Sequence, residues 1–192
     1  TLEDDLSRRD YRLNAIALSF DGTPHLIDPT GGLEDLLSGR IVAVREANLQ
    51  EDPLRLLRGL RLTAELGMTM DAQTLMMLRR NRSLLPDAAP ERIQAELMRL
   101  TAAPAADRAI ETLLDLQLLK PWTTARNASA DQRPAATEKR ADRLTDSERR
   151  QALPLARLTQ LLPDEGLKEL RFSRRQLPVS YTHLTLPTSV TV

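Results

Sequence analysis

Along the first part of the chain, apolar residues occur in short runs separated by turn residues, a pattern typical of strands and brief helices. Asp21-Gly22 stands between two of these runs and predicts a hairpin turn. The expected elements are hairpin strands at 13–18 and 25–28, a helix at 33–37 and a strand at 41–44. Residues 1–47 are therefore predicted to be one end of an α/β domain.

After residue 47 the apolar residues recur every three or four positions, which is the spacing of one helix face. Leu54, Leu57 and Leu60 begin the series, and Gly67 is a typical helix end. Helices are expected at 53–66, 73–85, 90–100, 105–119, 152–162 and 164–172. The polar, alanine-rich segment 123–150 lacks this period, so we predict a loop or weakly ordered segment there.

The two patterns together predict an α+β fold, in which one end of an α/β domain is followed by mostly α-helical segments. The expected segments are 1–47 for the α/β part, and 48–85 and 86–177 for the helical part. The chain begins at Thr1 rather than Met, and we interpret this start as a truncation.

The last segment, 178–192, has no charged residue, although the residues just before it are rich in Arg and Lys. A Thr- and Val-rich edge strand is one interpretation. However, Val179–Thr188 resembles one reading frame of a sequencing-library transposon adapter, and we expect 178–192 to be a non-native tail. On that interpretation, Tyr181 and His183 carry no information about function.

Composition narrows the classes of function. The 27 Lys and Arg residues balance 27 Asp and Glu, which argues against binding nucleic acid by bulk charge but leaves a local basic face open. With no Cys and only two His, disulfides, thiolate nucleophiles and multi-histidine metal centres are excluded. Aromatic residues, at 3%, are too few for a base-stacking sheet. Because no apolar run approaches the roughly 20 residues of a membrane span, we expect a cytoplasmic protein without a membrane partner.

The segment EDPLRLLRGLR carries the main candidate chemistry. Asp52 is expected to cap a helix that Pro53 begins. Arginines then follow at intervals of three along one drifting face, opposite the leucines: Arg55, Arg58 and Arg61. One interpretation is a capped helix with a solvated basic stripe, and the other is a face that binds a ligand.

An Asp–Arg pair on one helix turn has the hydrogen-bonding pattern to select a base. Asp52 can only accept hydrogen bonds and Arg55 can only donate them. Adenine and cytosine present an amino donor beside a ring-nitrogen acceptor, whereas guanine and uracil present the reverse order. The pair would therefore accept A or C and reject G or U, because a mismatched buried polar group costs about 1–3 kcal/mol. The further arginines suit triphosphate oxygens.

Three ordered segments, RRDYRLNAIAL, IDPTGGLEDL and EDPLRLLRGLRLTAELG, together resemble the bacterial tRNA nucleotidyltransferase and poly(A) polymerase family, of the class II CCA-adding type. APERIQAELMRL at 89–100 is similar to the family's next helical signature, and LRFSRRQ at 170–176 to a pattern of its body domain. The resemblance covers most of 2–177. It implies that 1–47 is the C-terminal part of a nucleotidyltransferase α/β head, 48–85 a helical neck and 86–177 a helical body.

This resemblance implies an enzyme that adds C, C and A to a tRNA 3′ end without a template, from CTP and ATP and with Mg²⁺ as cofactor. Asp52 and Arg55 would read the base, and Asp10 would lie near the ribose or order the arginines. The positions that match nucleotide-binding residues are Arg9, Asp52, Arg55, Arg58 and Arg61.

The family's metal-binding Asp-x-Asp pair and Gly-Ser loop precede the Arg-Arg-Asp motif. Here Asp4 and Asp5 are adjacent, so their side chains would diverge on a strand, and we assign neither a catalytic residue nor a metal ligand. We expect the catalytic carboxylates upstream of Thr1 and an inactive fragment.

Several alternatives stay open. One is a poly(A) polymerase of the same family, and another is an enzyme that adds only CC or only A. A third is a non-catalytic helical RNA-binding module. Arg79, Arg80 and Arg82 could contact RNA phosphates or form solvated surface.

Overall fold

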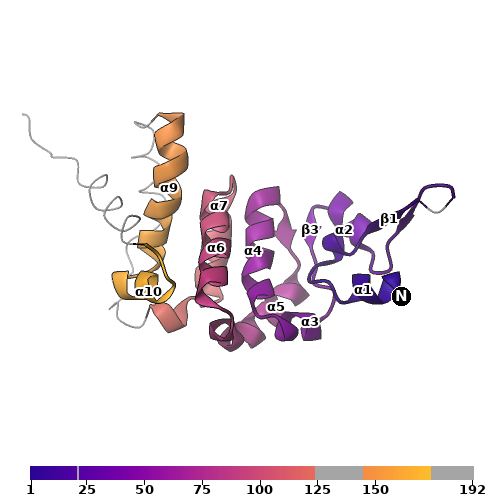
Figure 1. Cartoon of the computed structure of the whole chain (residues 1–192), viewed down its shortest axis with the longest axis horizontal. Coiled ribbons are helices and arrows are strands. Elements are labelled where there is room, and N and C mark those ends of the chain that lie inside the picture. Colours follow the sequence, from indigo (N-terminus) through magenta and orange to yellow (C-terminus); the bar gives the residue numbers. More distant parts are fainter. Residues whose placement is uncertain (21, 124–144, 174–192) are drawn as a thin grey trace, which may run out of the picture.

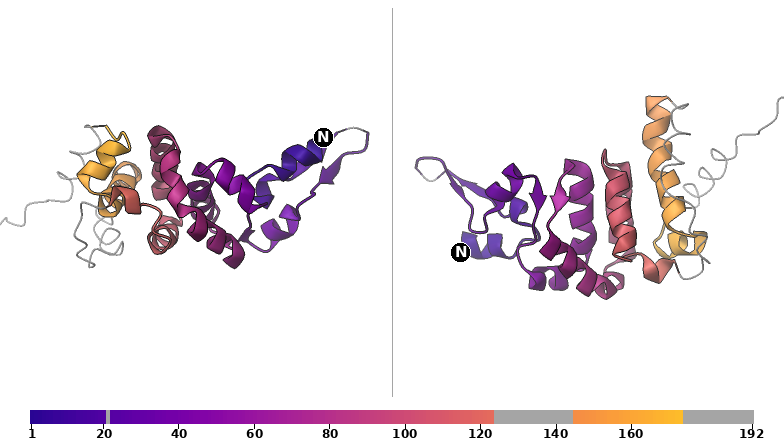
Figure 2. Two further views of the ribbon diagram at one scale, coloured as in Figure 1. Left: turned by 90° about the horizontal axis from the view of Figure 1, so that it is seen from below. Right: turned by 180° about the vertical axis from the view of Figure 1, so that it is seen from behind.

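The computed structural model describes residues 1–20, 22–123 and 145–173 and has the α+β architecture that the sequence predicts. Figure 1 and Figure 2 show a small mixed end that carries the N-terminus, followed by helices that stand side by side. The mixed end contains α1 (Leu2–Ser7), the 3-10 helix η1 (Arg12–Asn14), β1 (Ala17–Ser19), β2 (His25–Ile27), α2 (Gly32–Leu37) and β3 (Arg40–Ile41). The predicted tail at 178–192 lies outside the described residues, as do residues 124–144 of the predicted loop.

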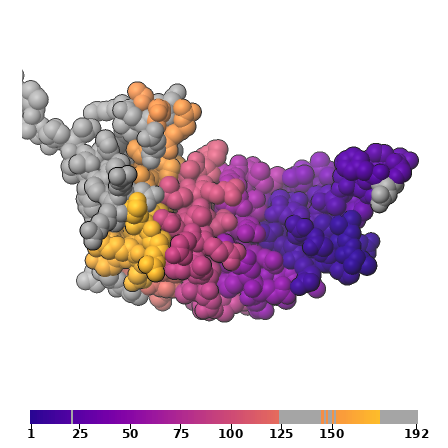
Figure 3. Space-filling model, viewed as in Figure 1, coloured from indigo at the N-terminus to yellow at the C-terminus, as the bar shows by residue number. Residues whose placement is uncertain are grey.

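The helical part follows in chain order and is bound to the mixed end by a short strand. Its elements are α3 (Glu46–Glu51), α4 (Leu54–Leu66), β4 (Thr69–Met70), α5 (Ala72–Asn81), η2 (Arg82–Asp87), α6 (Pro90–Ala102), α7 (Ala106–Asp115), η3 (Lys120–Trp122), α9 (Asp146–Leu161) and α10 (Asp164–Glu169). β4 pairs in parallel with β3. The elements form successive bands along an elongated molecule (Figure 3). Among the described helices, none combines the length and the apolar character needed to cross a membrane.

The hairpin forms where Asp21-Gly22 predicts it. β1 and β2 pair antiparallel, with Leu18 opposite Leu26, and Gly22 has a φ of 81°, which suits a residue without a Cβ atom. The first strand is shorter than predicted, because residues 12–14 form η1 instead. At the start of η1 the chain is hydrogen-bonded to residues outside the hairpin: the Arg12 N–H donates to the Val42 carbonyl at 2.9 Å.

α4 begins one residue later than predicted. Pro53 has helical dihedral angles but occupies the N-cap position, and the helix proper begins at Leu54. The carboxylate of Asp52 still caps it, because Oδ1 accepts a hydrogen bond from the Leu54 N–H at 3.3 Å. Gly67 ends the helix with a φ of 67°, as expected.

Three other helix boundaries differ from the prediction by four residues or more. The helix expected to reach residue 85 ends at Asn81 and continues as η2, which contains Pro86, a residue without an N–H to donate. The helix expected to reach residue 119 ends at Asp115, and Gln117 then takes a positive φ of 56°. α9 begins at Asp146, so helix replaces the last part of the predicted loop.

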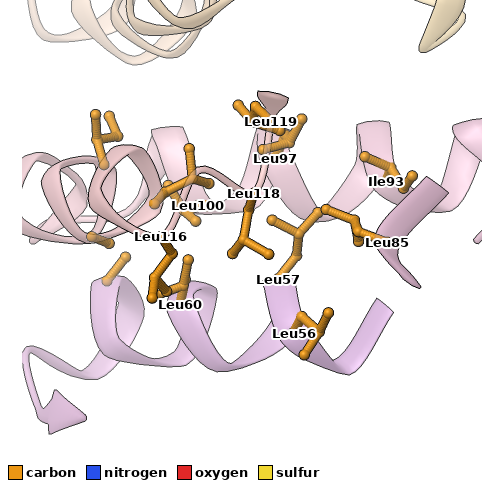
Figure 4. Packing of buried hydrophobic residues seen from close by; sticks show 14 of the residues in the cluster. Leu56, Leu57, Leu60, Leu85, Ile93, Leu97, Leu100, Leu116, Leu118 and Leu119 are labelled. Carbon is orange, nitrogen blue, oxygen red and sulfur yellow. The ribbon is translucent and has the colours of Figure 1, made fainter. Parts of the chain in front are cut away.

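One apolar cluster runs from the mixed end into the last helices. It includes the fully buried Leu57 and Leu60 of α4, which face Leu97 and Leu100 of α6 in Figure 4. The same cluster extends from Tyr11 to α10 and beyond. Since it crosses residues 47 and 85 without a break, the boundaries between head, neck and body stay a prediction.

Candidate functional site

A cavity of about 700 Å³ lies where the mixed end meets α4, and its lining is dominated by charged side chains. Arginines and carboxylates from both sides face it, together with side chains of α6. Of the residues predicted from the sequence, those that line it are Arg9, Asp10, Arg55, Arg58 and Arg61. Asp52 is absent from this lining. The structure thus brings together two segments that lie more than 40 positions apart in the sequence.

Asp10 joins the two sides of the cavity. Its buried carboxylate accepts hydrogen bonds from the Tyr11 N–H at 2.8 Å, from Asn14 Nδ2 at 3.0 Å and from Arg58 Nη1 at 3.1 Å. Burial opposes ionisation of this carboxyl, but the three hydrogen bonds outweigh burial and lower the pKa of Asp10 below its ordinary value. Asp10 therefore carries a negative charge near neutral pH and orients Arg58 toward the mixed end.

A second carboxylate, Glu96 of α6, is paired with Arg61 and also lies near Arg58. Arg61 Nε lies 2.6 Å from Glu96 Oε2, and the same guanidinium is bonded to Glu65. Arg58 Nε lies 3.6 Å from Glu96 Oε1. Since the Arg61 side chain is only 8% exposed, the interpretation of the three arginines as a solvated stripe is wrong for this position.

Glu96 was not among the predicted site residues, although the sequence carries a signal for it. In α6, Ile93, Glu96, Leu97 and Leu100 follow at helical spacing on one face. A carboxylate within an apolar face is unusual and needs a buried cation as a partner. Glu96 is indeed buried, and it is paired with the buried Arg61 and with the partly exposed Arg58.

The expected base-reading pair, Asp52 and Arg55, already has partners within the chain. Asp52 Oδ2 is 2.9 Å from Arg92 Nη2 of α6. Arg55 Nη1 donates to the backbone carbonyls of Arg8 and Asn48, at 3.1 and 2.9 Å. Its Nε is buried without a hydrogen-bond partner among the described residues. Both groups are therefore fixed in place, at the start of α4 and at the edge of the cavity respectively.

The other arginines of interest are exposed. Arg9 Nη2 lies 2.7 Å from Asp5 Oδ2, an ion pair whose two side chains are more than half exposed. Arg79, Arg80 and Arg82 are exposed on α5 and η2, and Arg80 is paired with Glu46 at 2.8 Å. Their interpretation as surface residues is consistent with this exposure.

Among the described residues, no three His, Asp or Glu side chains gather closely enough to hold a metal ion. Asp4 accepts hydrogen bonds from the Thr1 amino and hydroxyl groups at 2.9 and 2.7 Å, and Asp5 is paired with Arg9. The two adjacent carboxylates therefore have separate partners.

Two family descriptions match this chain. Residues 1–42 match the poly(A) polymerase head domain. Residues 67–123 match a domain described as the probable RNA- and SrmB-binding site of polymerase A. The first covers the mixed end up to β3, and the second covers the helical part from the end of α4 through η3.

Known proteins with similar sequences and structures agree with these two domain matches. The CC-adding tRNA nucleotidyltransferase of Synechocystis sp. is 38% identical over 130 residues, which are 68% of this chain and 31% of that relative. The enzyme of the same name from Halalkalibacterium halodurans is 46% identical over 101 residues, 52% of this chain and 26% of the relative. The crystal structure of the Bacillus stearothermophilus CCA-adding enzyme in complex with CTP matches 95% of this chain and 46% of its own, with a TM-score of 0.70 and 29% identity.

The chain thus spans about a third or less of the curated relatives that it matches. The motif order, the two domain matches and the shared fold are nevertheless consistent with one another along the described residues. The chain belongs to the class II tRNA nucleotidyltransferase and poly(A) polymerase family.

Proposed function

We propose that this chain is the rear of the head, the neck and the body of an enzyme that adds C, C and A to tRNA 3′ ends, using CTP and ATP. The observation that carries the proposal is the charged cavity in which the 8–10 turn of the head meets the arginines of α4. Guanidinium groups from two sides suit an anionic ligand, because each can donate paired hydrogen bonds to phosphate oxygens.

The residues divide into two roles in this proposal. Arg9, Arg58 and Arg61 bind the triphosphate end of the nucleotide, and Asp10 keeps Arg58 in place through their 3.1 Å contact. At the start of α4, Asp52 accepts from the amino group of C or A, and Arg55 donates to the neighbouring ring nitrogen. G and U present the opposite order and are rejected.

The proposal assigns no metal-dependent step to the described residues. We expect the catalytic carboxylates that hold this ion in residues preceding Thr1 of the intact protein. The partners are then the tRNA 3′ end and nucleoside triphosphates, and the place of action is the cytoplasm.

The test uses the full-length protein that contains this segment and a tRNA that ends before CCA. We expect the wild-type protein to add C, C and A, and Asp52→Ala to raise addition of U and G about tenfold relative to C and A. Glu46→Ala is the matched control, because Glu46 is also a partly exposed carboxylate paired with an arginine, but it belongs to α3 and pairs with Arg80 of α5 rather than standing at the start of α4.

Three results would contradict the proposal. They are a wild-type protein that adds no nucleotide, an Asp52→Ala variant with unchanged selection, and nucleotide addition by the 192-residue chain alone. A protein that binds RNA equally well with and without Asp52, and that adds nothing, would instead be a non-catalytic RNA-binding module.

A second candidate function is the addition of CC alone. Two relatives, 38% and 46% identical, carry the name CC-adding tRNA nucleotidyltransferase. The same assay separates the candidates by product length, because a CC-adding enzyme stops after two nucleotides when all four are supplied. A long A tail would indicate a poly(A) polymerase, and a single A on a tRNA ending in CC would indicate an A-adding enzyme.

A further inference from the structure

Three consecutive backbone carbonyls of the head each accept a hydrogen bond from a side chain of α3 or α4. The Ser7 carbonyl accepts from Asn48 Nδ2 at 2.9 Å, and the Arg9 carbonyl accepts from the same nitrogen at 2.6 Å. Between them, the Arg8 carbonyl accepts from Arg55 Nη1 at 3.1 Å. The turn that presents Arg9 and Asp10 to the cavity is thus held through its backbone as well as through the Asp10–Arg58 contact.

Asn48 is at the centre of these contacts. It lies in α3 and is fully buried. Its side chain holds the carbonyls on both sides of Arg8, and its own carbonyl accepts from Arg55 Nη1 at 2.9 Å. One residue therefore contacts both the head turn and the arginine expected to read the base.

The orientation of the Asn48 amide follows from its partners. Backbone carbonyls only accept hydrogen bonds, so the NH₂ group must face Ser7 and Arg9. Oδ1 is then buried without a partner among the described residues. An unpaired buried acceptor carries a free-energy cost, and here it accompanies two hydrogen bonds that join the head to the neck.

We propose that Asn48 is a positioning residue that sets the distance between the phosphate-binding turn at 8–10 and the base-reading Arg55. The proposal rests on the function proposed above, in which one nucleotide spans both sites. A shift of about 1 Å between two binding groups is enough to change how a bound molecule is recognised. Asn48 thereby controls which bases are accepted without touching the nucleotide.

The contacts explain why an asparagine is suited to this position. An alanine would remove the donor that the carbonyls of Ser7 and Arg9 share, and would leave the Ser7 carbonyl only its bond from Arg45 Nη2 at 3.1 Å. An aspartate would place a second oxygen against them, and like-charged or acceptor–acceptor contacts in a buried site are unfavourable. Both changes free the head turn to move relative to α4, and the aspartate also pushes it away.

The experiment measures nucleotide selection in the full-length protein, as the ratio of kcat/KM for CTP to that for UTP. We expect Asn48→Ala and Asn48→Asp to lower this ratio about tenfold, and Asn48→Ser, which keeps one donor, about threefold. Asn81→Ala is the matched control. Asn81 is also buried and bonds across elements, to Glu46 at 2.7 Å, but none of its hydrogen bonds among the described residues goes to the 8–10 turn or to Arg55. The CTP-to-UTP ratio of the Asn81→Ala variant should equal that of the wild type.

A merely structural role predicts something different. Loss of folded protein would lower kcat/KM for every nucleotide by one factor and leave the ratio unchanged, and this result in Asn48→Ala and Asn48→Ser would overturn the proposal. If Asn48→Ala does not fold, Asn48→Ser decides alone. If the wild-type protein adds no nucleotide, the proposed function fails first and this inference with it, so the two failures are distinguishable.

Discussion

Helix α4 has two faces that are stabilised by opposite kinds of interaction. Its apolar face packs Leu57 and Leu60 against α6, with no polar group to satisfy. Its polar face holds Arg58 and Arg61 between the carboxylates of Asp10, Glu65 and Glu96. The apolar face loses stability in proportion to the volume removed, whereas the polar face depends on every buried charge keeping a partner. Both faces therefore stabilise the fold, but only the polar face carries groups proposed to bind the nucleotide.

The largest effect is expected from breaking the apolar face. Leu57→Ala removes a fully buried side chain and should lower the free energy of unfolding by about 4 kcal/mol, as lost burial plus a cavity. Urea unfolding of this chain, followed by far-ultraviolet circular dichroism, measures the loss. Nucleotide selection in the full-length protein should not change. A loss below about 1 kcal/mol would mean that the neighbours of Leu57 refill the space.

The polar face should be almost as sensitive when only one partner is removed. Glu96→Ala leaves Arg61 with Glu65 and Arg58 with Asp10, so the expected loss is about 3 kcal/mol, at the lower end for a broken buried ion pair. The double variant Glu96→Leu with Arg61→Met should recover much of this loss. It also removes the buried charge of Arg61, which Glu65 alone balances in the single variant. Equal losses in the single and double variants would show that packing, rather than charge pairing, dominates here.

The same contrast explains what the sequence could predict. The apolar spacing of α4 and the Asp52-Pro53 start locate this helix to within one residue. α1, α3 and β4 were not predicted. With six residues or fewer they carry too little periodicity, and they lack the glycines at both ends that mark the equally short α2. These short elements owe their formation to tertiary contacts, such as the pairing of β4 with β3.

The residues of the site likewise differ in whether the sequence could predict them. The arginines of α4 are visible in the sequence because their spacing is local. Glu96 could have been found as a charge on an apolar face, but its partner Arg61 lies 35 positions away. Asn48 carries no sequence signal, since it acts on backbone carbonyls about 40 positions distant, and a carbonyl is the same at every residue. Side-chain-to-backbone contacts across elements become visible only in the structure.

The smallest expected effect concerns pH and again distinguishes the two faces. The pKa of Asp10 is lowered in the folded protein, so its contribution to stability is present above the pKa of the unfolded chain, about 4. That contribution is lost as the pH falls through the lower folded value. The urea midpoint should therefore fall with acidification in the wild type and less steeply in Asp10→Asn, which cannot take up the proton.

Leu57→Ala should keep the wild-type pH dependence at a lower midpoint, because the apolar face does not titrate. Equal slopes in Asp10→Asn and the wild type would show that other carboxylates govern acid unfolding and that the Asp10–Arg58 contact adds little stability.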